Sequence, residues 1–241
     1  MGPMLATVPG RKGPDGTTTR SGSGVSGVTS HCPGRSLHLP SDTAGPVLAI
    51  PASCSLEPVT TLVTLRPMTL ADLTTVGNWL RQPHVARWWT PESTAEQALE
   101  TLRAHLEEGA GAATKLCLVS IDGQPAGWCQ WYRWGDYPAE ATAVDAQDGE
   151  VGADYAIGNA DLLGCGFGTA MIAALISEVR RHHPGAGMVI APEAANVPSR
   201  RILEKNGFRL ESVRPLATER HDRPMAVYRL ASAGGDSASQ R

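Results

Sequence analysis

A glycine-rich segment, Leu163–Thr169 (LGCGFGT), constrains the fold of this chain more than any other feature. It follows a predicted strand that ends near Ile157 and precedes a predicted helix whose apolar residues recur at helical spacing from Met171 to Val179. A strand, a tight turn and a helix N-terminus bring unpaired backbone N–H groups together, and the helix dipole adds partial positive charge there. The segment therefore predicts an α/β fold with a candidate phosphate site.

The glycines of this segment narrow the type of ligand. A side chain at Gly164, Gly166 or Gly168 would keep the backbone away from a bound phosphate. The segment is not a Walker A loop, because no Lys-Ser or Lys-Thr pair follows it, and its GxGxG spacing differs from the GxGxxG of dinucleotide-binding folds. The residues alone leave two interpretations open, a phosphate site and a glycine-rich connection without a ligand.

The remaining periodicities predict a mixed sheet flanked by helices. Predicted strands lie at Val59–Arg66, Lys115–Ile121, Pro125–Tyr132, Glu150–Ile157, Met188–Ala191, Phe208–Val213 and Met225–Leu230. Predicted helices lie at Leu70–Leu80 with Thr69 as its cap, from Pro91 to about Glu108, at Met171–Val179 and at Ser199–Lys205. This order indicates an α/β fold with both parallel and antiparallel strand pairs, and it excludes a regular doubly wound fold.

Aromatic residues divide the chain into a core-forming part and an extension. All twelve Trp, Tyr and Phe lie beyond residue 58, whereas residues 1–58 contain 9 Gly, 8 Pro, 8 Ser and 6 Thr. Such a stretch cannot bury enough apolar surface to offset the entropy of ordering it. We therefore expect a disordered extension at 1–58, which is alternatively the product of a misassigned translation start, one domain at 59–231 and a flexible tail at 232–241.

Charge and cysteine usage exclude several function classes. The net charge of −3 does not favour a nucleic-acid partner. Residues 134–179 contain eight acids and no Lys or Arg, so this stretch would attract a cation if it lines a pocket, and it is a solvated face otherwise. Five scattered cysteines without a CxxC pair predict neither disulfides nor a metal site. Without a long apolar run or signal peptide, we expect a cytoplasmic protein with no membrane partner.

A second segment, Asn196–Phe208 (NVPSRRILEKNGF), predicts a helix and a Gly-Phe turn. Its Arg200 suits a phosphate, with a solvated basic face as the alternative. In this order, and behind the predicted hairpin, the two segments resemble the GCN5-related N-acetyltransferase superfamily. The resemblance implies that fold, with acetyl-coenzyme A as co-substrate. It also implies coenzyme contacts at Tyr155, Ile157, Leu163, Gly164, Cys165, Gly166, Phe167, Gly168, Thr169, Asn196 and Arg200.

Short segments make the resemblance closer to the aminoglycoside 6′-N-acetyltransferases. They are Val63–Met68 (VTLRPM), His84–Trp89 (HVARWW), Gly127–Tyr132 (GWCQWY), Gly152–Asp154 (GAD) and Leu163–Thr169. The resemblance implies transfer of an acetyl group to the 6′ amine of a cationic antibiotic, with Asp154 as its general base or its anchor. It further implies a substrate pocket lined by Trp89, Gln130 and Asp136. Core packing, a solvent-facing strand position and turn formation are the respective alternatives for these three residues.

Two departures from the family pattern affect the expected site. Leu203 stands where many members carry a Tyr that is proposed to protonate the departing thiolate, so the sequence assigns no side-chain acid. The departing thiolate needs little assistance from a side-chain acid, because the pKa of a free thiol is about 8.5. The stretch before Asn196, often DPxxxN in the family, reads APEAAN here, and Glu193 is the candidate replacement for the missing substrate-binding carboxylate.

The resemblance implies direct transfer in a ternary complex of a monomer or homodimer, without a covalent enzyme intermediate. A rival function with the same fold is acetylation of N-hydroxylysine-type siderophore precursors, whose enzymes usually carry His at the position of Asp154. A sensor that binds acetyl-coenzyme A without catalysis is the alternative from another class.

Overall fold

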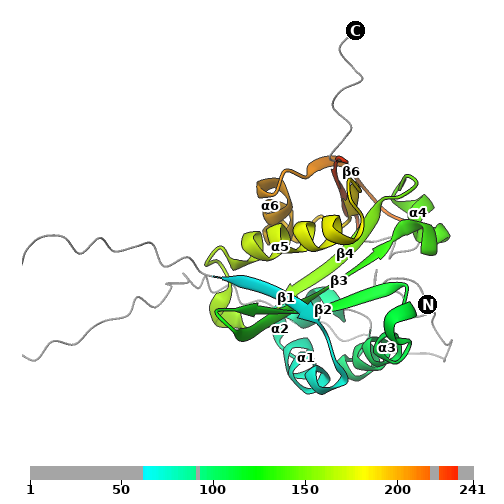
Figure 1. The fold of residues 1–241 in the computed structure, drawn as a ribbon. Helices are drawn as coiled ribbons and strands as arrows, with labels where there is room; N and C mark the ends of the chain where they lie inside the picture. Colours follow the sequence, from blue (N-terminus) through cyan, green and yellow to red (C-terminus); the bar gives the residue numbers. More distant parts are fainter. Residues whose placement is uncertain (1–61, 91–92, 218–222, 233–241) are drawn as a thin grey trace, which may run out of the picture.

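The computed structural model describes residues 62–90, 93–217 and 223–232, and their strands form one mixed sheet (Figure 1). The strands are β1 Val63–Pro67, β2 Thr114–Ile121, β3 Gln124–Arg133, β4 Val151–Ile157, β5 Met188–Ile190, β6 Arg209–Arg214 and β7 Met225–Leu230. Their order in the sheet is β1-β2-β3-β4-β5-β7-β6, with β4 and β5 parallel and the other neighbours antiparallel. The predicted mixed sheet is confirmed.

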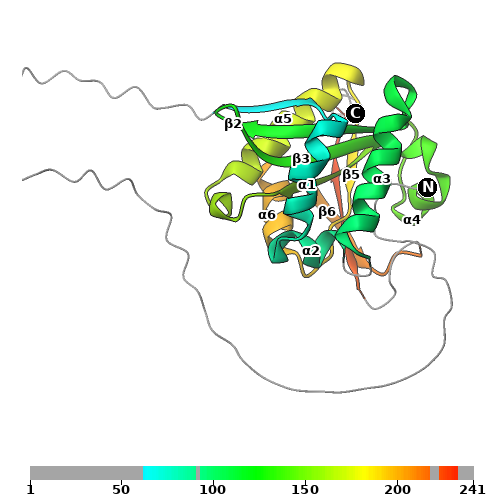
Figure 2. The ribbon, with the colours of Figure 1, turned by 90° about the horizontal axis from the view of Figure 1, so that it is seen from below.

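Helices cover both faces of this sheet. They are α1 Leu73–Leu80, α2 Pro83–Trp89, α3 Ala95–Glu107, α4 Pro138–Ala143, α5 Phe167–His182 and α6 Val197–Lys205. Helices α1, α2 and α3 lie on one face, and α5 and α6 lie on the other (Figures 1 and 2). Two of them were not predicted. Pro83 lies beyond the predicted helix Leu70–Leu80 and occupies the first turn of α2, where a proline fits, and α4 lies between the predicted strands Pro125–Tyr132 and Glu150–Ile157.

Local sequence signals account for several element boundaries. Asp122 and Gly123 have φ values of 49° and 78°, as a two-residue hairpin turn between β2 and β3 requires. Helix α3 begins after Thr94, whose side chain accepts a hydrogen bond from the Gln97 amide at 3.2 Å. The predicted start of this helix, Pro91, lies outside the described residues.

Strands β4 and β5 separate soon after they begin, and this separation positions the site. Their parallel pairing is limited to Val151 and Met188. The Val151 amide donates to Gly187 O at 3.0 Å on the β5 side, and the Gly158 amide donates to Ala126 O at 2.8 Å on the β3 side. Because backbone groups alternate along a strand, the odd-numbered residues of β4 direct their N–H and C=O groups toward β5. Beyond Val151, β4 therefore has an open edge.

Candidate active site

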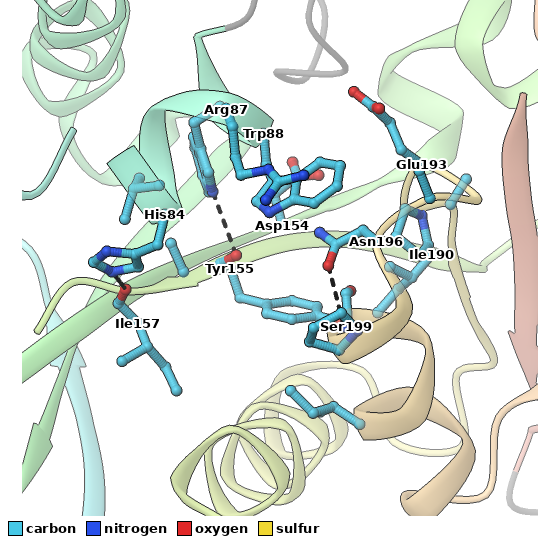
Figure 3. Close-up of a pocket in the computed structure, with 18 of the residues that line it drawn as sticks. His84, Arg87, Trp88, Asp154, Tyr155, Ile157, Ile190, Glu193, Asn196 and Ser199 are labelled. Atoms are coloured by element: carbon cyan, nitrogen blue, oxygen red, sulfur yellow. Dashed lines mark hydrogen bonds between the residues drawn. The ribbon is translucent and has the colours of Figure 1, made fainter. Parts of the chain in front are cut away.

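A cavity of about 430 Å³ lies where β4 and β5 separate (Figure 3). Its walls come from α2, β4, the segment after β5 and the first turns of α6. The sequence-predicted residues on these walls are Trp89, Asp154, Tyr155, Ile157, Leu163, Glu193 and Asn196. The structure therefore brings together residues from segments that are far apart in the sequence.

Asp154 carries a carboxyl group whose proton affinity is unusual. Burial raises its pKa to about 7, although hydrogen bonds from Gln130 and Tyr132 act in the opposite direction. Gln130 Nε2 donates to Asp154 Oδ2 at 2.8 Å. Gln130 is itself fully buried, and it lies behind Asp154 rather than on the cavity wall. A carboxyl group with this pKa can accept or release a proton near neutral pH.

Helix α2 contacts the open edge of β4 through two side chains. His84 Nε2 lies 3.0 Å from Ile157 O (Figure 3). Trp89 Nε1 donates to Tyr155 O at 3.4 Å. The Trp89 ring also packs on the buried Trp128, with ring centroids 4.8 Å apart. Trp89 is thus both a wall of the cavity and part of the core, which combines the two interpretations of its sequence pattern.

Asp136 lies outside the cavity, contrary to the expectation from the family resemblance. It belongs to a 3-10 turn after the end of β3 and accepts a hydrogen bond from Arg133 Nη2 at 2.8 Å. Arg133 pairs with Val151 at the start of β4, whereas the cavity lies along the later part of that strand. Asp136 instead lines a second hollow, together with Lys115 and other residues.

The charges on the described cavity wall are balanced. Asp154 and Glu193 are its carboxylates, and Arg87 and Arg223 are its guanidinium groups. Arg223 Nη1 donates to Glu193 Oε1 at 2.6 Å, and the Arg87 guanidinium lies 4.4 Å from the centroid of the Trp88 ring. Of the eight acids in residues 134–179, only Asp154 is on this wall. Of the two alternatives for the acidic stretch, the lining of this pocket is therefore not the one that the described residues form.

The glycine-rich turn leads into α5 at one end of the cavity. Gly164 and Gly166 have φ values of +75° and +87°, a conformation that side chains rarely adopt. Gly168 has a packing role, because a Cβ atom there would lie 2.5 Å from Cδ1 of Ile202 in α6, and its coenzyme contact stays a prediction. Gly168 therefore allows the two helices to pack closely. Leu163 lines the cavity.

The geometry of this turn fits an anionic group. The amides in the first turn of a helix have no acceptor within the helix. In α5, this turn comes shortly after Leu163 in the sequence, and Leu163 lies on the cavity wall. The Thr169 amide donates to Gly166 O at 3.0 Å and so begins the hydrogen bonding of α5. Cys165 Sγ is directed back toward Leu163 O at 3.6 Å, and Phe167 is the first residue of the helix.

Helix α6 contributes polar groups on the opposite wall. Asn196 Oδ1 accepts from the Ser199 amide at 3.2 Å, and Ser199 Oγ lies 2.7 Å from Tyr155 Oη. Arg200 does not line the cavity, because it donates to Tyr228 Oη and Ala194 O, both at 3.1 Å. The sequence analysis did not single out the lining residues His84, Arg87, Ser199 and Arg223 as site residues. The HVARWW segment was the available signal for the first two.

The comparisons with known proteins agree with this architecture. The sequence matches the family described as "Acetyltransferase (GNAT) domain" over residues 69–215, which is more than half of the chain. The chain belongs to the GNAT acetyltransferase family. The GNAT fold predicted from the resemblance is thereby confirmed.

Among its relatives in this family are enzymes that act on aminoglycosides. Aminoglycoside N(6′)-acetyltransferases type 1 of Klebsiella pneumoniae and Serratia marcescens are each 29% identical over 147 residues, which are 61% of this GNAT protein and 73% of the relative. The crystal structure of aminoglycoside acetyltransferase AAC(6′)-Ib with coenzyme A and kanamycin is 26% identical and has a TM-score of 0.54. That match covers 70% of this chain and 95% of AAC(6′)-Ib. A protein from Bacillus halodurans, 18% identical with a TM-score of 0.61, shares the fold.

Two further properties concern membranes and metals. Within the described residues, no helix has the length and apolar character needed to cross a membrane. The same part of the chain contains no group of three or more His, Cys, Asp or Glu side chains arranged to hold a metal ion.

Proposed function

We propose that this GNAT protein acetylates the 6′-amino group of aminoglycosides with acetyl-coenzyme A, and thereby confers antibiotic resistance. The observation that carries the proposal is Asp154, whose pKa is raised to about 7, on the wall of a cavity beside the open edge of β4. The relatives named as aminoglycoside 6′-acetyltransferases support the choice of acceptor.

The residues of the cavity fit acetyl-coenzyme A, which supplies an acetyl group activated as a thioester. The first turn of α5 offers amides for its pyrophosphate, and the open edge of β4 offers backbone groups for the amides of its pantetheine arm. The Tyr155 amide belongs to this open edge and is a candidate donor to the thioester carbonyl. We propose direct transfer without a covalent intermediate. Of the cysteines that the structure describes, Cys117 and Cys129 are buried in the sheet and Cys165 lies in the glycine-rich turn.

Asp154 is the proposed base for the acceptor. An alkylammonium group must lose a proton before its nitrogen can attack a thioester, and a positioned base typically contributes about 10²- to 10⁴-fold to the rate. Gln130 Nε2 donates to Asp154 Oδ2, and the carboxyl group lies on the cavity wall, where an acceptor amine can approach it. Trp88, Trp89 and Glu193 are the proposed walls of the acceptor part of the cavity.

The test is acetyl transfer to kanamycin or tobramycin, followed by release of the coenzyme thiol and by mass spectrometry of the product. Asp154→Asn should lower turnover by about 10²-fold or more, while the affinity for coenzyme A stays within about threefold. The matched control is Asp148→Asn, at an exposed acid of the same stretch, outside the cavity. Unchanged turnover in Asp154→Asn, or a product acetylated elsewhere than at the 6′ amine, would contradict the proposal.

A second candidate acceptor is favoured by the balanced charge of the cavity. Arg87 and Arg223 suit an acceptor that carries a carboxylate as well as an amine, and N-hydroxylysine-type siderophore precursors have both groups. The same assay with such a hydroxylamine separates the two candidates. Thiol release with the hydroxylamine alone would assign the protein to siderophore assembly.

A further inference from the structure

The Tyr155 side chain is a polar group with no role in the acetyl transfer proposed above. It lines the cavity, and its hydroxyl lies 2.7 Å from Ser199 Oγ on α6 (Figure 3). Because successive side chains of a strand point to opposite faces, Tyr155 and Asp154 lie on opposite sides of β4. A thioester placed along the open edge would thus have the carboxyl of Asp154 on one side and the phenol of Tyr155 on the other.

Position 203 of α6 cannot supply a proton donor in this chain. Leu203 is fully buried in the core between the sheet and the helices α5 and α6. It lies four residues after Ser199, on the same face of α6. Side chains in a helix lean toward its N-terminus, so a longer side chain at position 203 would extend toward the turn that contains Ser199. In this chain, the phenol of Tyr155 reaches that turn from the opposite wall.

We propose that the Tyr155 hydroxyl donates a hydrogen bond to the departing sulfur of the coenzyme, in place of a side chain from position 203. The inference rests on the proposed acetyl transfer. As the nitrogen–carbon bond forms and the carbon–sulfur bond breaks, the electron pair of the broken bond goes to sulfur. The ammonium proton passes through Asp154 to solvent before the attack, and the second proton, which the nitrogen releases as it forms the amide, then goes to Asp154. Sulfur later takes a proton from solvent.

The protonation state of Tyr155 agrees with a donor role. Burial raises the pKa of its phenol above the ordinary value near 10, so the hydroxyl keeps its proton throughout the neutral range. A phenol of this kind stabilises negative charge on sulfur by hydrogen bonding rather than by full proton transfer. Ser199 Oγ holds the hydroxyl in place before the coenzyme binds.

The test measures the thiol pKa of coenzyme A bound to the full-length protein, by ultraviolet absorbance of the thiolate against the complex with desulfo-coenzyme A. A donor to the thiolate lowers that pKa, so Tyr155→Phe should raise it by about one unit. Tyr137→Phe is the matched control, because it removes another buried hydroxyl, 2.6 Å from Thr114 Oγ1 and outside the cavity. The control should leave the thiol pKa unchanged.

Turnover provides a second readout with any acceptor that the protein acetylates. Tyr155→Phe should lower kcat by at least about 10-fold, with the KM for acetyl-coenzyme A within about threefold. Tyr155→3-fluorotyrosine keeps the shape of the side chain and strengthens the donor, so it should lower the thiol pKa below that of the wild type. If Tyr155→Phe fails to fold, the thiol pKa measured with the 3-fluorotyrosine variant tests the role of Tyr155.

An unchanged thiol pKa in Tyr155→Phe that still binds coenzyme A would overturn the inference, and so would a fluorotyrosine variant whose thiol pKa is not lowered. The titration needs coenzyme A alone. A wild-type protein that acetylates no aminoglycoside but shows the predicted shifts would therefore refute the acceptor and retain the role of Tyr155.

Discussion

Asp154 and Gln130 form a pair in which burial raises the pKa of the carboxyl and the hydrogen bond from the amide lowers it. Since the carboxylate is the proposed base, kcat/KM should rise with pH and reach half its maximum at about pH 7. Gln130→Leu removes a hydrogen bond that lowers the pKa of Asp154, so the half-maximal point should move to higher pH. A pH–rate profile of both proteins checks this, and coincident profiles would contradict the assigned role of Gln130.

The same carboxyl group makes stability depend on pH. Its pKa is raised on folding, so the folded state retains a proton that the unfolded chain has lost, and stability falls as pH rises from about 4 to about 7. Asp154→Asn removes this effect. In urea unfolding, the variant should gain about 2–4 kcal/mol relative to the wild type between about pH 5 and about pH 8.5. A constant difference between the two proteins would show that the carboxyl is not buried as described.

Glu193 is neutralised by its neighbour in the described structure. Arg223 donates to Glu193 at 2.6 Å, which opposes an attraction between that carboxylate and a polycation. Arg223→Gln should therefore lower the KM for kanamycin by about 3- to 10-fold, as expected for about 1 kcal/mol of added attraction. Steady-state kinetics with Glu193→Gln/Arg223→Gln is the control, and the gain should disappear there. A raised KM in the single variant would instead favour an anionic acceptor.

At the scale of elements, the turn before α5 depends on glycine conformation. Gly166 has a φ of +87°, and alanine there should cost about 1–2 kcal/mol and weaken coenzyme binding. Gly135 provides the matched control, because its φ is ordinary and an added Cβ would meet open space. Thermal unfolding and coenzyme titration of Gly166→Ala and Gly135→Ala check this. Equal effects of the two substitutions would contradict the strain argument.

Local signals explain which elements the sequence could predict. Asp122-Gly123 and the alternating residues around it specify the β2–β3 hairpin, because both turn residues tolerate positive φ. Pro83 was ambiguous, because proline both ends one helix and suits the first turn of the next. The packing role of Gly168 could not be predicted, because Ile202 lies 34 positions away in the sequence and meets it only through the contact between α5 and α6.

At the scale of the whole molecule, charge along the chain did not predict charge in the cavity. Glu150 and Glu178 of the acidic stretch pair with Arg229 and Arg181 instead of lining it. Asp154 was singled out through the GAD segment of the family resemblance, and the structure places it on the cavity wall. Arg223 could not be predicted as a cavity residue, because only the pairing of β7 with β5 brings it to the cavity wall.

The domain boundaries remain a prediction from composition, and limited proteolysis tests them. Proteases should cut residues 1–58 first and leave a resistant fragment close to residues 59–231, since a stretch without aromatics has little to bury. Mass spectrometry of the fragment in the presence and absence of coenzyme A identifies its ends. Early cleavage within β2 or β3 at the same rate would contradict a single domain.

The open edge of β4 also matters for how copies of this protein coexist at high concentration. An unpaired strand edge is a template onto which another chain can add a strand, and such addition leads to aggregation. In this protein, side chains of α2 contact the carbonyls of Tyr155 and Ile157 on that edge. The edge is also short and recessed within a cavity. The gap that we propose for the coenzyme is therefore shielded against intermolecular β-sheet formation.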